Sequence, residues 1–480
     1  MNKRIALMIS ALALSLGALS CVTPTPTNTN SVVVSSPTPA PSASPTPGAV
    51  AETVLVPVTL PLLDALLADE SFQGELKSKL NLTADQIAAL RKASAEEIGK
   101  LQQTTEPQEG AAAEARDRAT EVIQNVVGAQ QTAALLGLAR ERWLKGSEAD
   151  EAGKPAEATM LPGPNAVPQD TRVVVNIPAY RMDLFQNGNL IKSYKIGIGY
   201  PQFPLPTGLR KAQTIIFNPT WTPPDEPWVG KMKDIAVGEK VAAGSPLNPL
   251  GPIKIPIGMP SLIHGGKPLA KIGTFASHGC VGLTNAQIKN FAKTLTVAAG
   301  KEVSDQTIAG YLKDSTKTRS VKLDAPVPVE LRYETIVVED GKLYIYKDVY
   351  DQNTNTEENL RTTLAKNNVQ FENFSADERD QVLEALNAMS SRPQKQVPKI
   401  ANANASASPS VSTNNANENS AVANANATEK KPKTPRKPIS RKQKQVVVES
   451  AALSGKGYPA PVELDTGTGK PAKKVAAKTD

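Results

Sequence analysis

Hydrophobic positions recur with two different periods along the chain. From Leu60 to about Lys145 apolar residues follow helical spacing, and Thr83 with Gln86 predicts a capping box at one helix start. Between about 170 and 350 the period changes to two, in short segments separated by Pro and Gly. The pattern predicts an antiparallel helical hairpin followed by a mostly β domain.

Turn signals support the strand prediction. Asn187-Gly188 separates two apolar segments, and Glu339-Asp340-Gly341-Lys342 separates another pair. Asn-Gly and Asp-Gly are the strongest short-range signals for a β-hairpin, because both central residues must tolerate positive φ. We therefore expect one hairpin near the start of the β domain and another near its end.

The remaining segments have no period that would fill a core. Pro, Thr and Ser dominate 22–58, and the Asn-Ala and Lys-Pro tracts after 393 bury too little apolar surface to fold. The resulting organisation is a signal peptide 1–21, a linker 22–58, a helical hairpin region 59–146, a linker 147–169, a mostly β domain with a C-terminal β-hairpin 170–350, a helical segment 351–392 and a disordered tail 393–480.

The N-terminus has the features of an export signal. Lys3 and Arg4 precede an apolar stretch, Ile5 to Leu19, that is too short to span a bilayer stably. Small residues before Cys21 resemble a lipoprotein processing site, so we expect a lipid on Cys21 that anchors the protein to the membrane. Cleavage by an ordinary signal peptidase is the alternative. Both predict an exported protein of the cell envelope or periplasm.

Charge adds one further candidate contact. The formal net charge is +7, and eight Lys and Arg lie between Lys430 and Lys444. Such a cluster is typical of a solvated tail and is a candidate contact for anionic polymers. Basic and aromatic residues do not alternate as in nucleic-acid grooves, so no nucleic-acid partner is expected.

The candidate chemistry lies in two short motifs. His264-Gly265-Gly266 precedes Ser277-His278-Gly279-Cys280-Val281-Gly282, and together they hold both histidines of the chain and the only cysteine besides Cys21. A thiol becomes a strong nucleophile as a thiolate, and an imidazole within hydrogen-bond reach can take its proton. Thr284 and Gln287 predict a helix beginning just after the cysteine. A zinc site is the rival interpretation, but the spacing supplies no fourth ligand.

At these residues the sequence resembles the L,D-transpeptidase (YkuD-type) catalytic domain. That family combines a His-Gly pair with Ser/Thr-His-Gly-Cys and a nearby Asn, which here are His264-Gly265, Ser277 to Cys280, and Asn285. The likeness extends over about 170–300. The resemblance implies an L,D-transpeptidase-type β-sandwich with short helices, preceded by the α-helical hairpin and followed by the disordered tail.

The resemblance also implies roles for individual residues. Cys280 would attack the tetrapeptide stem of peptidoglycan and release D-Ala, with His264 as general base, oriented by the carbonyl of Gly265. His278 and Gly279 would shape the site and its oxyanion hole. No cofactor is needed, because the donor bond supplies the energy. The expected substrate-binding residues are Ser277, Val281, Gly282, Asn285 and Trp221.

One residue departs from the family pattern. The family usually has Arg two residues after the cysteine, where this chain has Gly282. Lys254, Lys267 and Lys271 are candidates to supply the missing positive charge.

Three alternatives use the same sequence features. Water in place of an amine would make the protein an L,D-carboxypeptidase, and a protein amine would make it a protein-to-peptidoglycan ligase. A non-catalytic cell-wall-binding envelope protein is the third, in which the basic tail and the helical region would carry the contacts.

Overall fold

The computed structural model describes residues 58–101, 111–145, 165–223, 229, 234–236, 238–258, 261–391 and 438–468. Cys21, the predicted signal peptide and most of the predicted linker 22–58 lie outside these residues. Within the described part of the chain, no helix is long and apolar enough to cross a membrane.

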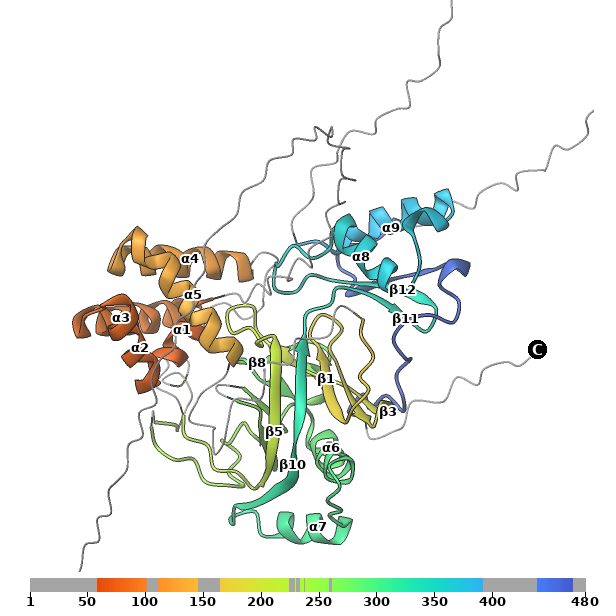
Figure 1. The fold of residues 1–480 in the computed structure, drawn as a ribbon. Helices are drawn as coiled ribbons and strands as arrows, with labels where there is room; N and C mark the ends of the chain where they lie inside the picture. Colours follow the sequence, from red (N-terminus) through yellow and green to blue (C-terminus); the bar gives the residue numbers. More distant parts are fainter. Residues whose placement is uncertain are drawn as a thin grey trace, which may run out of the picture. The chain divides into compact units, whose positions relative to one another are not determined.

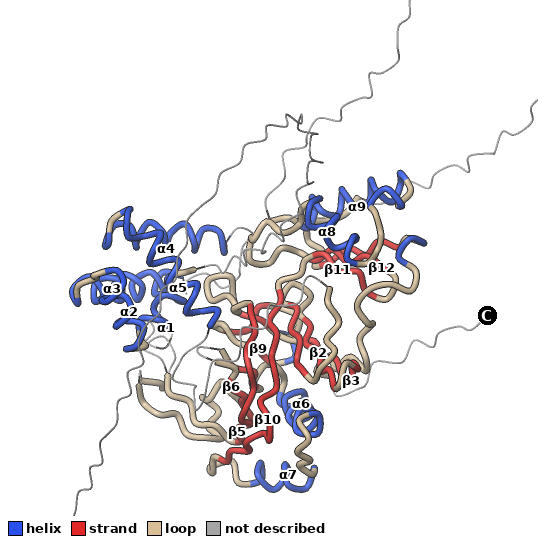
Figure 2. The backbone as a smooth tube through the Cα atoms, viewed as in Figure 1, coloured by secondary structure: helices blue, strands red, loops and turns tan. Residues whose placement is uncertain are grey.

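The N-terminal part is helical, as predicted, but it is not a two-helix hairpin. Five helices occur in its described residues (Figure 2): α1 Leu60–Leu67, α2 Glu70–Leu80, α3 Ala84–Leu101, α4 Ala111–Val127 and α5 Ala129–Lys145. Asn81 ends α2 with φ 53°, and Gly128 separates α4 from α5 with φ 80°. Because helical residues need negative φ, Asn81 ends α2 just before the helix start that the Thr83–Gln86 capping box predicts, whereas Gly128 divides the later helical region into two helices.

These helices share a core of their own. Leu63, Leu67, Phe72 and Leu76 are fully buried in it together with residues of α3, α4 and α5. The predicted capping box is confirmed, because Thr83 N donates to Gln86 Oε1 at 3.0 Å and Gln86 N donates to Thr83 Oγ1 at 3.1 Å.

The central element is an eight-stranded mixed sheet with the order β3-β2-β1-β10-β5-β6-β7-β9. Its strands are β1 Arg172–Asn176, β2 Arg181–Gln186, β3 Asn189–Lys195, β5 Gly208–Phe217, β6 Ile253–Pro256, β7 Leu262–His264, β9 Val281–Gly282 and β10 Arg319–Arg332. The pairs β1/β10 and β7/β9 are parallel and the others are antiparallel. Figure 1 shows the two longest strands, β5 and β10, side by side.

A smaller parallel pair and two helices complete this region. The strands β4 Ile198–Gly199 and β8 Phe275–Ser277 pair with each other, and η2 Leu269–Lys271 is a single 3₁₀ turn. The helices are α6 Asn285–Ala298 and α7 Asp305–Lys313. The result is a sheet-rich mixed fold with helices, which confirms the coarse fold prediction and leaves the sandwich arrangement a prediction.

Helix α6 begins directly after β9 and fixes that end of the sheet. Thr284 and Gln287 form the predicted capping box. Ile288, Phe291 and Leu295 are fully buried in the main core with strand residues such as Ile263. Because the apolar side of α6 is packed against the sheet, the chain immediately before it is held in place.

The last strand-forming region extends the described structure beyond the predicted catalytic domain. The strands β11 Ile336–Glu339, β12 Lys342–Tyr346 and β13 Gln445–Glu449 form a three-stranded sheet in this order. The helices α8 Glu357–Lys366 and α9 Ala376–Met389 share a core with it, and the 3₁₀ turns are η3 Phe371–Asn373 and η4 Ala451–Leu453.

The prediction that all of 393–480 is disordered is therefore wrong for 438–468. Strand β13 pairs along its length with β12, and Val446 and Val448 are buried. The basic cluster also has structural contacts, since Lys444 Nζ donates to Gly273 O at 2.6 Å and lies over the ring of Tyr180. The disorder prediction overlooked the run Val446-Val447-Val448, whose β-branched residues are typical of strands.

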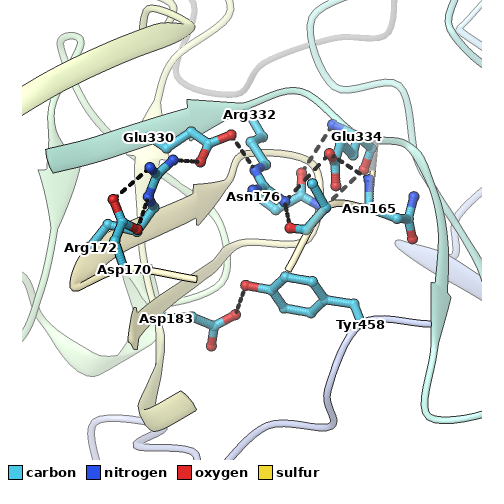
Figure 3. Close-up of polar contacts among 10 residues, drawn as sticks. Asn165, Asp170, Arg172, Asn176, Asp183, Glu330, Arg332, Glu334 and Tyr458 are labelled. Carbon is cyan, nitrogen blue, oxygen red and sulfur yellow. Dashed lines mark hydrogen bonds and ion pairs between the residues drawn. The ribbon is translucent and has the colours of Figure 1, made fainter. Parts of the chain in front are cut away.

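Buried ion pairs join β1 to β10, and a hydrogen bond joins β2 to the C-terminal segment (Figure 3). Glu330 is almost fully buried and contacts both Arg172 and Arg332 at 2.8 Å. Tyr458 donates through its hydroxyl to Asp183 Oδ2 at 3.1 Å. Buried charges are tolerated when each is paired, so removing one partner would destabilise the fold by several kcal/mol, about 3–5.

Candidate active site

Two adjacent parallel strands bring the two motifs together. Ile263 of β7 is in register with Val281 of β9, and His264 is in register with Gly282. Ile263 and Val281 are both fully buried in the core. Because side chains alternate between the faces of a strand, His264 and the residues on either side of Val281, which include Cys280, lie on the other face.

His264 is buried and held by its own backbone turn. Its Nδ1 lies 2.7 Å from Gly265 O, the contact that the family resemblance implies, and the residue is 3% exposed. A carbonyl only accepts hydrogen bonds, so Nδ1 carries the proton in this contact and Nε2 is left as the basic nitrogen. Burial, followed by the charge of Lys267, lowers the pKa of His264 to about 3. The imidazole is therefore neutral at rest.

Cys280 is a half-buried free thiol at the end of a tight turn. The Ser277 hydroxyl donates to Cys280 O at 2.5 Å and accepts from Cys280 N at 3.0 Å. Gly279 has φ 91°, a backbone conformation that residues other than glycine rarely adopt. Burial raises the pKa of the Cys280 thiol, whereas a hydrogen bond to the Leu262 backbone and the Lys267 charge lower it. Burial is the largest effect, so the thiol is protonated at neutral pH.

A loop from Gly199 to Leu205 covers the turn before the cysteine. Tyr200 N donates to Ser277 O at 2.9 Å. The rings of Tyr200 and Phe203 lie 5.6 and 4.5 Å from the His278 ring. Part of the His278 residue is exposed to solvent. Burial of its imidazole, followed by the charge of Lys267, lowers the pKa of His278 to about 4. The imidazole of His278 is thus positioned by aromatic contacts.

Tyr350 holds both ends of this loop, a role that no motif in the sequence indicated. Its hydroxyl donates to Gly199 O at 2.8 Å and accepts from Leu205 N at 3.0 Å. The Tyr350 side chain is fully buried, and its own backbone N donates to the Tyr333 hydroxyl at 2.6 Å. A single phenol therefore connects the chain after β12 to the loop over the turn.

The predicted substrate-binding residues have different positions. Asn285 accepts from Gly266 N through Oδ1 at 2.8 Å, so it supports the turn after His264. Trp221 is 9% exposed, and its backbone pairs with Val241. The side chain of Val281 is fully buried in the core, so a contact of Val281 with substrate would have to use its backbone. The binding roles of the others stay predictions.

The three candidate lysines also differ in position. Lys254 is in register with His264 across β6 and β7, and burial lowers its pKa. The Lys271 ammonium lies 6.0 Å from the centre of the Tyr200 ring. Lys267 lies against Gly282: a Cβ added to that glycine would fall 2.8 Å from Lys267 Cγ. The structure therefore places Lys267 beside the position where the family usually has Arg.

The described residues contain no group of three or more His, Cys, Asp and Glu side chains arranged to hold a metal ion. The donor set around Cys280 in this part of the chain is thus smaller than zinc sites commonly use.

Several solved L,D-transpeptidase structures resemble about a third of this chain. A mutant L,D-transpeptidase from Enterococcus faecium is 15% identical, covers 34% of this chain and 50% of its own, and has a TM-score of 0.21. The catalytic domain of the E. faecium enzyme is 15% identical and covers 35% of this chain and 100% of its own, with a TM-score of 0.22. L,D-transpeptidase 3 from Mycobacterium tuberculosis, in complex with a faropenem-derived adduct, is 16% identical and covers 34% of this chain and 60% of its own, with a TM-score of 0.21.

The chain matches about half the length of the first of these relatives, and TM-scores this low carry no argument about mechanism. No curated protein matches the chain. The family model gives the most direct result, because it covers β7, β9 and the turn before Cys280. Residues 170–321 match the L,D-transpeptidase (YkuD) catalytic domain, the family that the motifs around His264 and Cys280 resemble.

Proposed function

We propose that this protein is a cysteine L,D-transpeptidase that forms peptidoglycan cross-links. Cys280 attacks the carbonyl of the bond between the third residue of a tetrapeptide stem and its terminal D-Ala. D-Ala leaves, and an amine of a second stem takes its place. The observation that supports this best is that His264 and Cys280 lie on the same face of the paired strands β7 and β9, opposite the core. Both residues are within the segment that matches the family model.

The first step is a proton transfer coupled to attack. Since the pKa of His264 is lowered and that of Cys280 is raised, the resting pair is a neutral imidazole and a thiol. The Cys280 proton moves to His264 Nε2 as Sγ bonds to the substrate carbonyl carbon. The contact of Nδ1 with Gly265 O holds the ring in the tautomer that accepts this proton.

The second step releases D-Ala and the third forms the new bond. The tetrahedral intermediate collapses, the carbon–nitrogen bond breaks, and His264 returns its proton to the leaving amine. The acceptor amine then attacks the thioester and loses a proton to His264, and Cys280 leaves as the thiol after regaining it. The number of amide bonds is unchanged, so no cofactor enters.

The turn before Cys280 is the proposed oxyanion site. Cys280 N already donates to the Ser277 hydroxyl. We therefore assign stabilisation of the oxyanion to the backbone N–H groups of His278 and Gly279, which the loop from Gly199 to Leu205 holds in place. His278 shapes this side of the site.

The envelope assignments belong to the same proposal. Export to the cell envelope, a lipid on Cys21 that anchors the chain to the membrane, and contact of the basic tail with anionic polymers all place the enzyme beside its substrate. Substituting Cys21→Ser is expected to release the protein from membranes without changing its reaction.

The test is mass spectrometry of purified tetrapeptide muropeptides incubated with the full chain or with its Cys280→Ala variant. Dimers that lack one D-Ala, made by the wild type alone, are the expected result. Tripeptides without dimers would identify a carboxypeptidase, and a muropeptide joined to a protein amine would identify a ligase. Unchanged muropeptides would favour a non-catalytic wall-binding protein.

A further inference from the structure

The space above Gly282 is filled by another residue. A Cβ added to Gly282 would lie 2.8 Å from Lys267 Cγ, 3.1 Å from its Cε and 3.4 Å from its Cδ. Real Cβ atoms do not approach other atoms as closely as the first of these distances. The aliphatic part of the Lys267 side chain therefore occupies the space that a side chain at position 282 would fill. This is the face on which Cys280 lies.

The backbone fixes Lys267 in this place. Lys267 N donates to Leu283 O at 3.1 Å, and the preceding Gly266 N donates to Asn285 Oδ1 at 2.8 Å. Both acceptors lie at the start of α6, which is packed on the sheet. Leu283 N in turn donates to His264 O at 2.9 Å. Because these hydrogen bonds hold the backbone of Gly266 and Lys267 against the chain after β9, the lysine side chain has little freedom to leave Gly282.

The charge of Lys267 reaches all three reactive side chains. It lowers the pKa of Cys280, of His264 and of His278, and Cys280 in turn raises the pKa of Lys267 against the lowering effect of burial. Lys267 is half-buried, and no carboxylate among the described residues forms an ion pair with it. An ammonium group in such a position favours an anion beside it.

We propose that Lys267 is the active-site cation, which stabilises the Cys280 thiolate and attracts anionic reactants to it from its place over Gly282. This inference rests on the proposed function, because it assigns a positioning residue to the same thiol. It explains how a glycine can stand two residues after the nucleophile: the positive charge comes from the neighbouring turn instead of the strand.

Alkylation of the thiol tests the proposal without any peptidoglycan. In a Cys21→Ser background Cys280 is the only thiol of the chain. The rate of its reaction with iodoacetamide is measured against pH. Removing the charge in Lys267→Met is expected to move the midpoint of this profile upward by about one pH unit, and Lys267→Arg is expected to leave it near the wild-type value. Lys271→Met is the matched control, with a smaller shift, because that ammonium lies over Tyr200.

A second reagent reports on attraction of anions. Iodoacetate carries a carboxylate and iodoacetamide does not, so the ratio of their rates measures the local positive charge. The ratio is expected to fall several-fold in Lys267→Met and to be retained in Lys267→Arg. Thermal unfolding of each variant shows whether it is folded, and Lys267→Gln replaces the Met variant if that one is not.

Gly282→Ala gives an independent test of the geometry. The new methyl group pushes the lysine stem aside, so the midpoint should rise in the wild type and should not rise further in the Lys267→Met background. An unchanged midpoint in folded Lys267→Met, or equal shifts from Gly282→Ala in both backgrounds, would overturn the proposal. Failure of transpeptidation with a normal Lys267 effect on alkylation would refute the proposed function alone.

Discussion

At the scale of single residues, the site combines a buried neutral imidazole with a protonated thiol. The residue types were predictable from the sequence, because histidine and cysteine are rare in this chain and fall in two glycine-flanked motifs. The contribution of Lys267 was not predictable, because three lysines lie near the motifs. Only the three-dimensional structure shows that Lys267 is the one over Gly282. The burial of the Val281 side chain was not predictable from its position next to Cys280 in the sequence either, because it depends on which face of β9 packs on the core.

The buried imidazole predicts a pH dependence of stability. The folded pKa of His264 is about 3, whereas its ordinary value is 6.5, so only the unfolded chain binds the proton between these values. The stability that His264 contributes is therefore complete above pH 6.5 and is lost as the pH falls toward 3. Between pH 7 and 5 the loss amounts to about 2 kcal/mol for this residue.

Urea unfolding of the wild type and of His264→Gln at both pH values provides the measurement. The difference between their free energies of unfolding should shrink by about 2 kcal/mol at pH 5. Burial raises the pKa of Glu339 to about 7, so this residue stabilises the fold more as the pH falls. Its contribution is the same in the wild type and the variant and therefore cancels in the difference. A difference that does not change with pH would contradict the prediction.

At the scale of elements, local signals were reliable and distant pairings were not. The capping boxes at Thr83 and Thr284 and the turn at Asn187-Gly188 each depend on a few consecutive residues, and the structure has all of them. The pairing of β1 with β10 joins residues more than a hundred positions apart, and nothing in either segment specifies the partner. The loop from Gly199 to Leu205 had no predicted support for the same reason.

The hydroxyl of Tyr350 is expected to position that loop. In Tyr350→Phe the buried Leu205 N–H loses its acceptor, which costs about 1–3 kcal/mol of stability. The loosened loop no longer holds the turn before Cys280, so D-Ala release at saturating tetrapeptide should slow several-fold. Urea unfolding and the release rate measure the two effects. Tyr344→Phe, which removes a hydroxyl from a half-buried tyrosine of β12, should change neither, and equal effects of both variants would refute the role.

At the scale of the whole molecule, the described structure extends well past the segment that matches the family. Residues 170–321 match the family model, whereas β11, β12 and β13 with α8 and α9 form a core of their own further along the chain. Tyr458 and Tyr350 connect this later part to the strands and loop of the earlier one. The minimal folding unit is therefore longer than the family match suggests.

Deleting residues 438–480 is expected to destabilise the protein strongly. The deletion removes the buried side chains of Val446, Val448 and Leu453, each of which contributes about 1.5–3 kcal/mol. It also leaves Asp183 without the Tyr458 hydroxyl. Circular dichroism during heating should show a lower melting temperature or a lost transition. The control deletes 469–480, which lie outside the described residues, and an equal melting temperature for both deletions would contradict the prediction.

The late position of β13 also has a consequence in time. Its partner β12 is synthesised long before Gln445 to Glu449, so until then one edge of the small sheet has unpaired N–H and C=O groups. A nascent or prematurely terminated chain therefore exposes a binding site for chaperones and proteases that the finished chain conceals. Closure of this sheet marks a chain that has been synthesised through β13, and it would allow the cell to distinguish such copies from those interrupted before that strand.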